Sequence, residues 1–406
     1  METRLKMKLF RMILIFIMFL IFVSTEPVSQ SLPYAKAEKT GMLLCRLERI
    51  SEVINEAIRN REFPGAVVII GKEGKIVFRE AYGQSQWVPE SRSMMIDMIF
   101  DMASITKPIA TATSIMILVE QGRINLWDKV KDYLPCFQPY KKDAKSDPED
   151  ARIWHLLTHT SGLPPYADVA VLEKLYGAPC PRDRLVDYIG KLPKTDPPGK
   201  VFHYSCLGYI SLAYIIELIS GMDLAEFSQK CIFNPLGMKH TFFTPPDTLF
   251  GLCVPTEVIE GKALIGIVHD PLARLQGGIS GNAGLFSSAD DLSIFAQMML
   301  NKGLFNGVRI LSPLSVERMT AVYPKAEFAG RGLGWDMDSA YSTNKGDLFG
   351  EHSYGHTGYT GTSIWIDPDT RTFVIFLTNR VHPDDKGKIL SLRSKIANIV
   401  AASIIE

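Results

Sequence analysis

Two stretches near opposite ends of the chain have the residue pattern of β-hairpins. Apolar residues at 66–70 and 76–79 flank a Lys-Glu-Gly turn, and those at 363–366 and 373–377 flank a Pro-Asp turn. Short apolar runs bounded by turn residues are typical of buried strands. We therefore expect one hairpin from each end of the chain, with both joined in a single antiparallel sheet.

Helical spacing of apolar residues marks the segments beside these hairpins. It predicts an amphipathic helix over about 47–58, a terminal helix over 389 to about 404, and mostly helical structure in the middle of the chain. The fold class is therefore α+β, with an antiparallel sheet built from both termini and flanked by helices, and a mostly helical second lobe. A binding site in such a fold lies in the groove between the sheet and the lobe.

The stretch FDMASITKPIAT, residues 100–111, places a serine three residues ahead of a lysine. The segment 105–121 is apolar nearly all round and is followed by glycine, as in a buried helix with a glycine C-cap. Because proline is tolerated only near a helix start, Pro108 places Ser104 at or just before the first turn. Lys107 then lies over the same face and can reach the Ser104 hydroxyl.

A lysine acts as a base near neutral pH only if its pKa falls from ~10.4 to about 7. We expect burial at the apolar helix start to lower the pKa of Lys107 in this way. Tyr204, in FHYSCLGY ahead of a second apolar helix over 207–219, is a candidate for relaying the proton. The stretch GHTGYTGT, residues 355–362, leads into a strand whose edge can offer a backbone N–H to an oxyanion, opposite the N–H of Ser104.

The order of these motifs resembles that of the serine β-lactamase and penicillin-binding protein superfamily. Ser-x-x-Lys is followed by a Tyr-x-x motif about a hundred residues later and by His-Thr-Gly about a hundred and fifty residues beyond that. The resemblance is closest to the class C β-lactamase-like branch, which includes DD-carboxypeptidases, D-aminopeptidases and esterases. It runs from about residue 47 to the C-terminus, and the connecting stretches that share it are 153–164, 233–243, 277–300 and 332–335.

The resemblance implies catalysis through an acyl-enzyme. Ser104 would be the nucleophile, Lys107 its activating partner, and Tyr204 the group that passes the proton to the leaving group and later from the hydrolytic water. The resemblance implies no metal and no organic cofactor.

The same resemblance assigns substrate-binding residues to the His-Thr-Gly stretch. His356 and Thr357, beside Gly358, would hold the carboxylate or polar tail of the substrate. The backbone N–H groups of Ser104 and Tyr359 would form the oxyanion hole.

Cys206 departs from the pattern of the family, in which the second motif usually reads Tyr-x-Asn. Asparagine offers two donors and one acceptor to a substrate amide, whereas a thiol offers one weak donor. We therefore expect Cys206 either to face the substrate with poor amide recognition or only to pack, and we do not expect ordinary β-lactamase activity.

Composition and charge narrow the class of partner. The 406 residues are 46% hydrophobic and include 44 basic and 44 acidic residues, with no basic run outside the N-terminal region. The chain can bury a large core, and no nucleic-acid partner is expected.

The N-terminal segment has the pattern of an export signal. Four basic residues precede an uninterrupted apolar run at 12–23, which is shorter than the roughly 20 residues of a spanning helix. We expect residues 1–37 to be a signal peptide or an N-terminal membrane anchor, and residues 38–406 to form the hydrolase domain. The protein would then act in the periplasm or at the cell surface, with membrane association if the segment is retained.

Cysteine and histidine spacing gives no reason to expect a metal site. The six cysteines are widely spaced without a C-x-x-C motif, and the pairs His155/His159 and His352/His356 lie beside turn residues instead of within a helical pattern. We interpret the HTSG stretch at 159–162 as a structural turn.

Three functions remain open from the sequence. The first is an exported serine hydrolase acting on D-amino-acid peptides, amides or esters of the cell envelope, with a small or peptidoglycan-derived substrate. The second is an esterase or weak class C-type β-lactamase. The third is a penicillin-binding sensor that acylates without turnover, against which the presence of both Lys107 and Tyr204 counts.

Overall fold

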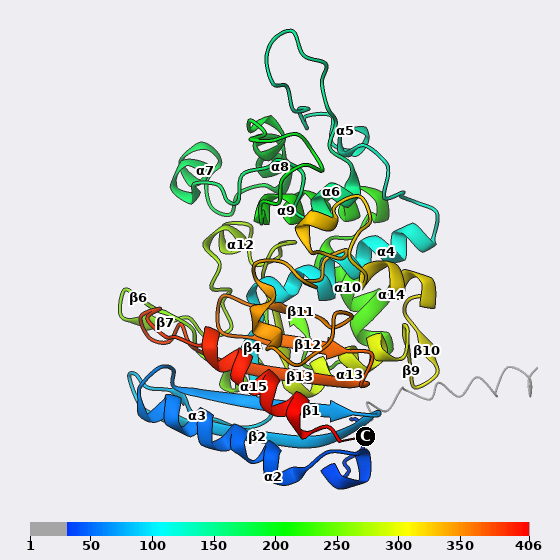
Figure 1. Ribbon diagram of the computed structural model, residues 1–406. Helices are drawn as coiled ribbons and strands as arrows, with labels where there is room; N and C mark the ends of the chain where they lie inside the picture. The colour runs from blue at the N-terminus through cyan, green and yellow to red at the C-terminus, as the bar shows by residue number, and fades with distance from the viewer. Residues whose placement is uncertain (1–30, 406) are drawn as a thin grey trace, which may run out of the picture.

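Strands from both ends of the chain share one antiparallel sheet, as the hairpin patterns predicted. The computed structural model describes residues 31–405, and the two hairpins lie side by side in it, with Val68 opposite Phe376 (Figure 1). Every neighbouring pair in this six-stranded sheet is antiparallel. In the order of hydrogen-bonded neighbours, its strands are β11 (Tyr354–Thr357), β12 (Ser363–Asp367), β13 (Thr372–Thr378), β1 (Gly65–Lys72), β2 (Lys75–Gln86) and β3 (Arg92–Ser93).

Alternate residues of β1 enter two different hydrophobic cores, because successive side chains of a strand point to opposite faces. Val67 and Ile69 pack with the helical lobe, whereas Val68 and Ile70 pack with helices from the two ends of the chain. The predicted terminal helices are confirmed on this second face (Figure 1). The helices that cover the sheet are α2 (Leu44–Leu47), α3 (Arg49–Arg59) and α15 (Leu390–Ser403) on that face, and α13 (Ala289–Leu300) on the other.

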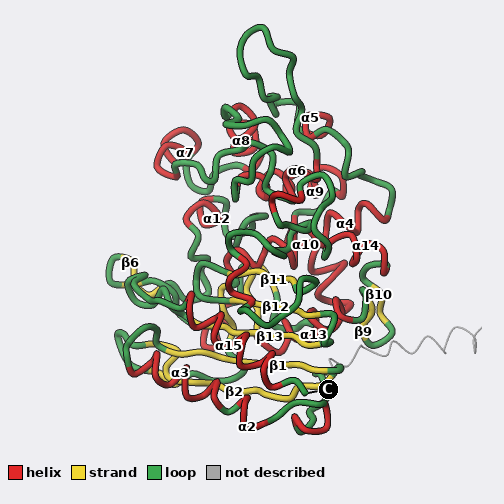
Figure 2. The backbone as a smooth tube through the Cα atoms, in the orientation of Figure 1, coloured by secondary structure: helices red, strands yellow, loops and turns green. Residues whose placement is uncertain are grey.

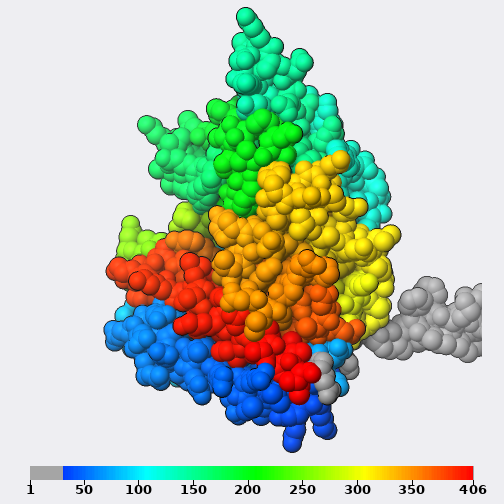
Figure 3. Space-filling model, in the orientation of Figure 1, coloured from blue at the N-terminus to red at the C-terminus, as the bar shows by residue number. Residues whose placement is uncertain are grey.

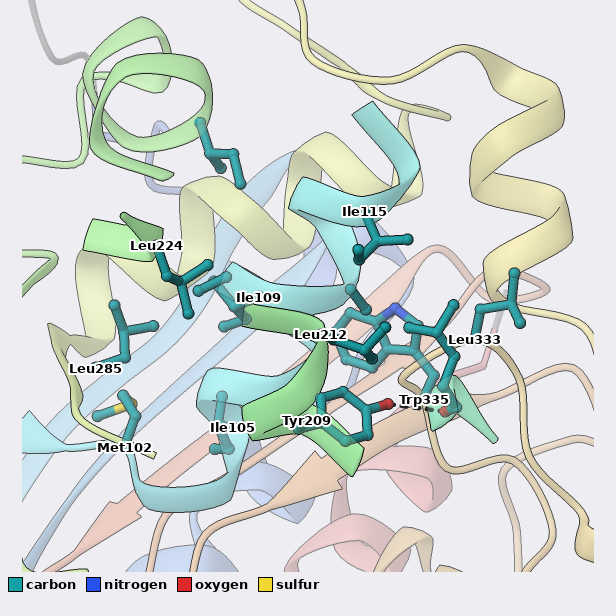
Figure 4. Packing of buried hydrophobic residues seen from close by; sticks show 14 of the residues in the cluster. Met102, Ile105, Ile109, Ile115, Tyr209, Leu212, Leu224, Leu285, Leu333 and Trp335 are labelled. Carbon is teal, nitrogen blue, oxygen red and sulfur yellow. Dashed lines mark hydrogen bonds between the residues drawn. The ribbon is translucent and has the colours of Figure 1, made fainter. Parts of the chain in front are cut away.

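The middle of the chain forms the mostly helical lobe that the sequence predicts, so the α+β fold class is confirmed (Figure 2). Figure 4 shows Ile109 and Ile115 in one apolar cluster with Tyr209 and Leu212 of the second buried helix. The lobe contains α4 (Thr113–Glu120), α5 (Val130–Tyr133), α6 (Ile153–Leu157), α7 (Val169–Tyr176), α8 (Arg182–Lys191), α9 (Cys206–Ser220), α10 (Leu224–Ser228), α11 (Asn234–Leu236), α12 (Pro271–Leu275) and α14 (Pro313–Met319).

A small second sheet connects the lobe to the large sheet. Its strands are β4 (Ile99–Asp101), β8 (Leu285–Ser288) and β5 (Phe242–Phe243). Two further short hairpins are separate from it, and they are formed by β6 (Val258–Ile259) with β7 (Lys262–Ala263) and by β9 (Leu304–Phe305) with β10 (Val308–Arg309). The last residue of β4 lies three positions before Ser104, so this sheet fixes where the candidate nucleophile begins its turn.

The helix expected over 105–121 is present, but it is not a regular α-helix throughout. It begins with a 3₁₀ turn (Ala103–Ile105), continues as a π-helical segment (Lys107–Ala112), and becomes regular only in α4. Pro108 has no N–H to donate and its ring crowds the preceding turn, which a wider π turn relieves. The helix ends as predicted, at Gly122 with a positive φ of 67°.

The two ends of the described chain lie together at one side of the molecule, away from the tip of the helical lobe (Figure 3). The segment ahead of residue 38 already contacts the sheet, because the N–H of Ile76 donates to Pro33 and the N–H of Ala35 donates to Ile76. The apolar run at 12–23 lies outside the described residues, so the boundary at 37 stays a prediction. Within the part that the structure describes, no single helix is long and apolar enough to cross a membrane.

Candidate active site

Ser104 follows a turn that the preceding strand holds in an uncommon conformation. Ala103 has a positive φ of 46°, which is rare for a residue with a Cβ, and its N–H donates to Oδ1 of Asp101 at 2.8 Å. Strained backbone of this kind persists where surrounding contacts determine it, and it often occurs at functional sites. The turn presents Ser104 to a cavity between the sheet and the helical lobe.

Lys107 is fully buried and makes direct contact with the candidate nucleophile. Its Nζ lies 2.9 Å from Oγ of Ser104 and also donates to the backbone carbonyl of Asn282 at 2.9 Å. The serine–lysine contact expected from the helix spacing is therefore present. Asn282 was not singled out from the sequence, because a backbone carbonyl leaves no signal in the residue type.

The expectation of a lowered lysine pKa is wrong. Burial works to lower the pKa of Lys107, but Cys206 and Tyr204 work in the opposite direction when they carry negative charge, and the pKa of Lys107 lies above its ordinary value. As an ammonium group Lys107 can stabilise negative charge on Ser104 Oγ, whereas as a neutral amine it can take the proton of the hydroxyl.

The Tyr204 ring lies close to a neutral imidazole and to two basic side chains. It stacks on His159 with ring centroids 4.3 Å apart, while Lys107 Nζ and Arg331 Cζ lie 4.9 and 5.9 Å from its centroid. Burial, followed by the charges of Arg331 and Lys107, keeps the pKa of His159 well below its ordinary value. Nδ1 of His159 accepts the backbone N–H of Ser205, so the HTSG turn also positions the Tyr204 segment.

The two backbone N–H groups proposed for an oxyanion hole are both unpaired. Neither Ser104 nor Tyr359 donates its N–H to another group in the part of the chain that the structure describes. Thr360 Oγ1 donates to Asp101 O at 2.7 Å, and Thr362 Oγ1 donates to Met102 O at 3.1 Å. These bonds join the loop after β11 to the segment just before the nucleophile, although about 260 residues separate them.

Gly358 allows this close approach of the two segments. A Cβ at this position would lie 2.1 Å from Thr362 Oγ1 and 2.4 Å from the carbonyl of Met102, both too close for any side chain. The glycine of the His-Thr-Gly motif is therefore required by packing against the backbone before Ser104.

A cavity of about 640 Å³ brings most of the predicted site residues together. Two predicted residues, Lys107 and Cys206, do not line it: Lys107 lies beneath Ser104, and Cys206 is half-buried at the start of α9. The lining residues are Ser104, Tyr204, Arg331, Asp336, Tyr341, His356, Thr357, Gly358, Tyr359, Arg380, Gly387, Lys388, Ile389, Leu390, Ser391 and Arg393.

His356 is present in the cavity wall but is not a cation. Burial, followed by the charges of Arg331 and Lys107, holds the pKa of His356 well below its ordinary value. Its Nδ1 lies 2.9 Å from the carbonyl of Thr357, and its buried Nε2 has no partner among the described residues. A carboxylate would therefore meet a neutral imidazole here, and a fixed positive charge must come from elsewhere.

Arginines that sequence reasoning missed supply positive charge around the cavity. Arg331 is 1% exposed, its Nη1 lies 3.5 Å from Asp336, and its Nε and Nη2 have no partner in the described residues. Arg393 of α15 donates through Nη2 to the carbonyls of Gly358 and Thr362 at 3.0 and 2.8 Å. Among 44 basic residues, sequence spacing alone cannot select these two, although Arg331 directly precedes the GLGW stretch.

The described residues contain no group of three histidine, cysteine, aspartate or glutamate side chains arranged to hold a metal ion. The six cysteines all have free thiols in the structure.

The fold and the serine–lysine–tyrosine arrangement define a class of serine hydrolases that includes β-lactamases and penicillin-binding proteins. The sequence model of the family described as Beta-lactamase matches residues 50–397. The chain belongs to this family and is a serine hydrolase of that type, and the superfamily predicted from the motifs is confirmed.

Curated relatives resemble the chain over most of its length. The Bacillus subtilis (strain 168) protein "N-acetylmuramyl-L-alanine amidase" is 32% identical over 376 residues, covering 85% of this chain and 83% of that protein. The Escherichia coli (strain K12) protein "Putative D-alanyl-D-alanine carboxypeptidase" is 29% identical, covering 89% and 91%. Among solved structures, "EstCE1, a hydrolase with promiscuous acyltransferase activity" has a TM-score of 0.68 at 23% identity and covers 88% of this chain and 99% of that one, which supports the fold.

Proposed function

We propose that this chain is an exported hydrolase that forms an acyl intermediate on Ser104 and acts on D-amino-acid peptides, amides or esters of the cell envelope, in the manner of a DD-carboxypeptidase. The observation that carries the proposal is the 2.9 Å contact between Lys107 Nζ and Ser104 Oγ at the edge of the cavity. The amidase and carboxypeptidase names of the relatives support amide substrates.

The geometry supports a stepwise acyl transfer. Ser104 Oγ attacks the substrate carbonyl, the proton passes through Tyr204 to the leaving nitrogen or oxygen, and the bond to the leaving group breaks. The N–H groups of Ser104 and Tyr359 bind the oxyanion, and the Lys107 ammonium stabilises charge on Oγ. Water then attacks the acyl group, and its proton passes through Tyr204 to Ser104 Oγ as the bond between Oγ and the acyl carbon breaks, which releases the acid product and restores the serine hydroxyl.

The cavity wall supports a substrate with an anionic end. Arg380, Lys388 and Arg393 line it beside the His-Thr-Gly strand. A carboxylate on the leaving residue would be attracted by these cations, while Thr357 could hydrogen-bond to it. Small peptides and peptidoglycan-derived peptides both have such a carboxylate on the leaving residue.

Labelling with a fluorescent fluorophosphonate and a fluorescent penicillin tests the proposal and separates it from a sensor function. We expect rapid labelling by the fluorophosphonate, and any penicillin adduct to be released within the assay, because Tyr204 is positioned to activate water. A penicillin adduct that persists would support a sensor without turnover, and no labelling by either reagent would contradict the proposed serine chemistry.

Substrate preference is expected to depend on Cys206. If this side chain faces the substrate's amide, a peptide or β-lactam side-chain carbonyl meets a weak thiol donor, at a cost of roughly 1–3 kcal/mol, or about 5- to 150-fold in kcat/KM. We predict that simple esters are turned over faster than cephalosporins or acyl-D-Ala-D-Ala, and that Cys206→Asn narrows the gap. The measurement is kcat/KM for one substrate of each kind.

Cys231→Asn is the matched control, since Cys231 is also half-buried but lies in the helical segment Gln229–Phe233, whereas Cys206 directly follows the Tyr204 segment at the start of α9. If the unchanged protein prefers amides, or if Cys206→Asn leaves the ratio as it was, Cys206 only packs and substrate preference is set elsewhere in the cavity.

Export is proposed from the basic and apolar N-terminal pattern. Cell fractionation should place the protein outside the cytoplasm, in the soluble extracytoplasmic fraction if the segment is cleaved and in the membrane fraction if it is retained. Recovery of the full-length chain from the cytosol would exclude this localisation.

A further inference from the structure

One peptide group carries the second donor of the oxyanion hole, because the N–H of Tyr359 belongs to the same planar unit as the carbonyl of Gly358. That carbonyl accepts the N–H of Gly361 at 3.1 Å and so closes a β-turn. The hydrogen bond of such a turn does not use the N–H of its second residue, which here is Tyr359. The direction in which this N–H points is therefore set by the contacts that hold the Gly358 carbonyl.

A buried arginine side chain binds that carbonyl. Arg393 of α15 is 7% exposed, and its Nη2 donates to the carbonyls of Gly358 at 3.0 Å and of Thr362 at 2.8 Å. The carbonyl of Thr362 also accepts the N–H of Gly358 at 2.7 Å. One guanidinium nitrogen thus joins the first residue of the turn to the residue that follows the turn, and this fixes the plane of the peptide between Gly358 and Tyr359.

Arg393 has no acidic partner that would account for its burial. Among residues 31–405 its side chain donates only to these two carbonyls, and its Nε has no partner. Burial, followed by the charge of Arg380, lowers the pKa of Arg393 to about 9, which leaves it charged at neutral pH. Burying a cation without a counterion is unfavourable, so an uncharged side chain would fill the same space at lower cost.

The positive charge acts on the donor peptide itself. A cation at a peptide carbonyl oxygen draws electron density from the N–H of the same peptide, and linked hydrogen bonds strengthen one another in this way. The N–H of Tyr359 then becomes a stronger donor to an oxyanion. Arg380 lacks this effect, because its Nε donates to the carbonyl of Tyr359, which belongs to the next peptide, and its charge is paired with Asp385.

We propose that Arg393 is a positioning residue of the oxyanion hole, which orients and polarises the peptide between Gly358 and Tyr359, so that acyl transfer from neutral and charged substrates alike depends on it. This inference rests on the acyl-serine function proposed above. The role is independent of any attraction between the same guanidinium and a substrate carboxylate.

The test uses two neutral probes, p-nitrophenyl acetate and phenylboronic acid, on the full protein and on Arg393→Met. Neither probe has a carboxylate, so attraction of substrate charge plays no part. Phenylboronic acid adds to a serine Oγ to give a tetrahedral boronate, one oxygen of which takes the place of the oxyanion. We expect kcat/KM for the ester to fall and the Ki of the boronic acid to rise, each by about 10- to 100-fold, which is less than the loss of roughly 10²- to 10³-fold for an oxyanion donor removed outright.

Lys395→Met is the matched control, since Lys395 is an exposed cation of the same helix. It should leave both values unchanged. Arg393→Lys keeps a cation that can reach one of the two carbonyls, and we expect it to recover part of the loss in both measurements. Thermal unfolding of each variant gives the folded fraction to which the rates are referred.

Unchanged values in folded Arg393→Met would overturn the inference. Slower ester hydrolysis without weaker binding of the boronic acid would also overturn it, because the loss would then not lie in stabilisation of the oxyanion. If Arg393→Met does not fold, Arg393→Lys decides: a loss shared by both measurements supports the inference, and unchanged values overturn it. Failure of the proposed function is distinguishable, because it would appear as loss of p-nitrophenyl acetate hydrolysis and of fluorophosphonate labelling in the unchanged protein.

Discussion

Replacement of Ser104 by alanine is expected to abolish covalent labelling by fluorophosphonate and by penicillin and to leave the fold intact. The hydroxyl is the atom that Lys107 contacts, and it lies at the cavity surface next to two unpaired backbone N–H groups. Removing it leaves no oxygen at this position to form the acyl bond. Labelling is measured by in-gel fluorescence, and folding is measured by circular dichroism and thermal unfolding.

Ser114→Ala provides the matched control for this result. Ser114 is buried in α4 of the same helical segment, and its Oγ has no partner among the described residues. It should label like the unchanged protein. Labelling of Ser104→Ala at the normal rate would show that the nucleophile lies elsewhere.

Replacement of Lys107 by alanine is expected to lower the acylation rate by roughly 10²- to 10⁴-fold, the range for a positioned proton-transfer or charge-stabilising group. The change removes the ammonium that contacts Ser104 Oγ and faces the Tyr204 ring. Without it, negative charge on either oxygen is less stable during the attack. The measurement is the second-order rate constant for fluorophosphonate labelling, determined for the folded fraction of each variant.

Alanine also leaves a cavity, because Lys107 is fully buried. Lys107→Met separates the two effects, since it keeps most of the side-chain volume and removes the nitrogen. We expect both variants to be slow in acylation although the methionine variant is the more stable. Normal specific activity in folded Lys107→Met would make Lys107 a structural residue.

The sheet and the sequence-local part of the site could be predicted because their signals are short-range. The turn residues between 70 and 76 and between 366 and 373 define two hairpins, and Pro108 near the helix start places Ser104 and Lys107 on one face. That the two hairpins pair with each other could be inferred only indirectly, because strands that are apolar on both faces have to be buried within one sheet.

Long-range contacts account for what the sequence could not predict. The charge state of Lys107 depends on Cys206 and Tyr204, which lie about a hundred residues away in sequence, and so helix-start burial alone led to the wrong direction of its pKa. Arg393 has ordinary sequence surroundings. Its position beside the site comes from tertiary contacts that no local pattern encodes.

The loop after β11 is hydrogen-bonded to the backbone just before Ser104. These bonds determine when, during synthesis and folding, the protein can become active. During synthesis the ribosome delivers Ser104, Lys107 and Tyr204 long before Thr360 and Thr362, which hold the second backbone donor in place. The central strand β1 likewise lacks its neighbour β13 until nearly the whole chain has emerged. A nascent chain therefore carries its nucleophile without an assembled oxyanion hole, and the protein becomes chemically competent only when roughly its last 50 residues have folded onto the N-terminal part of the chain.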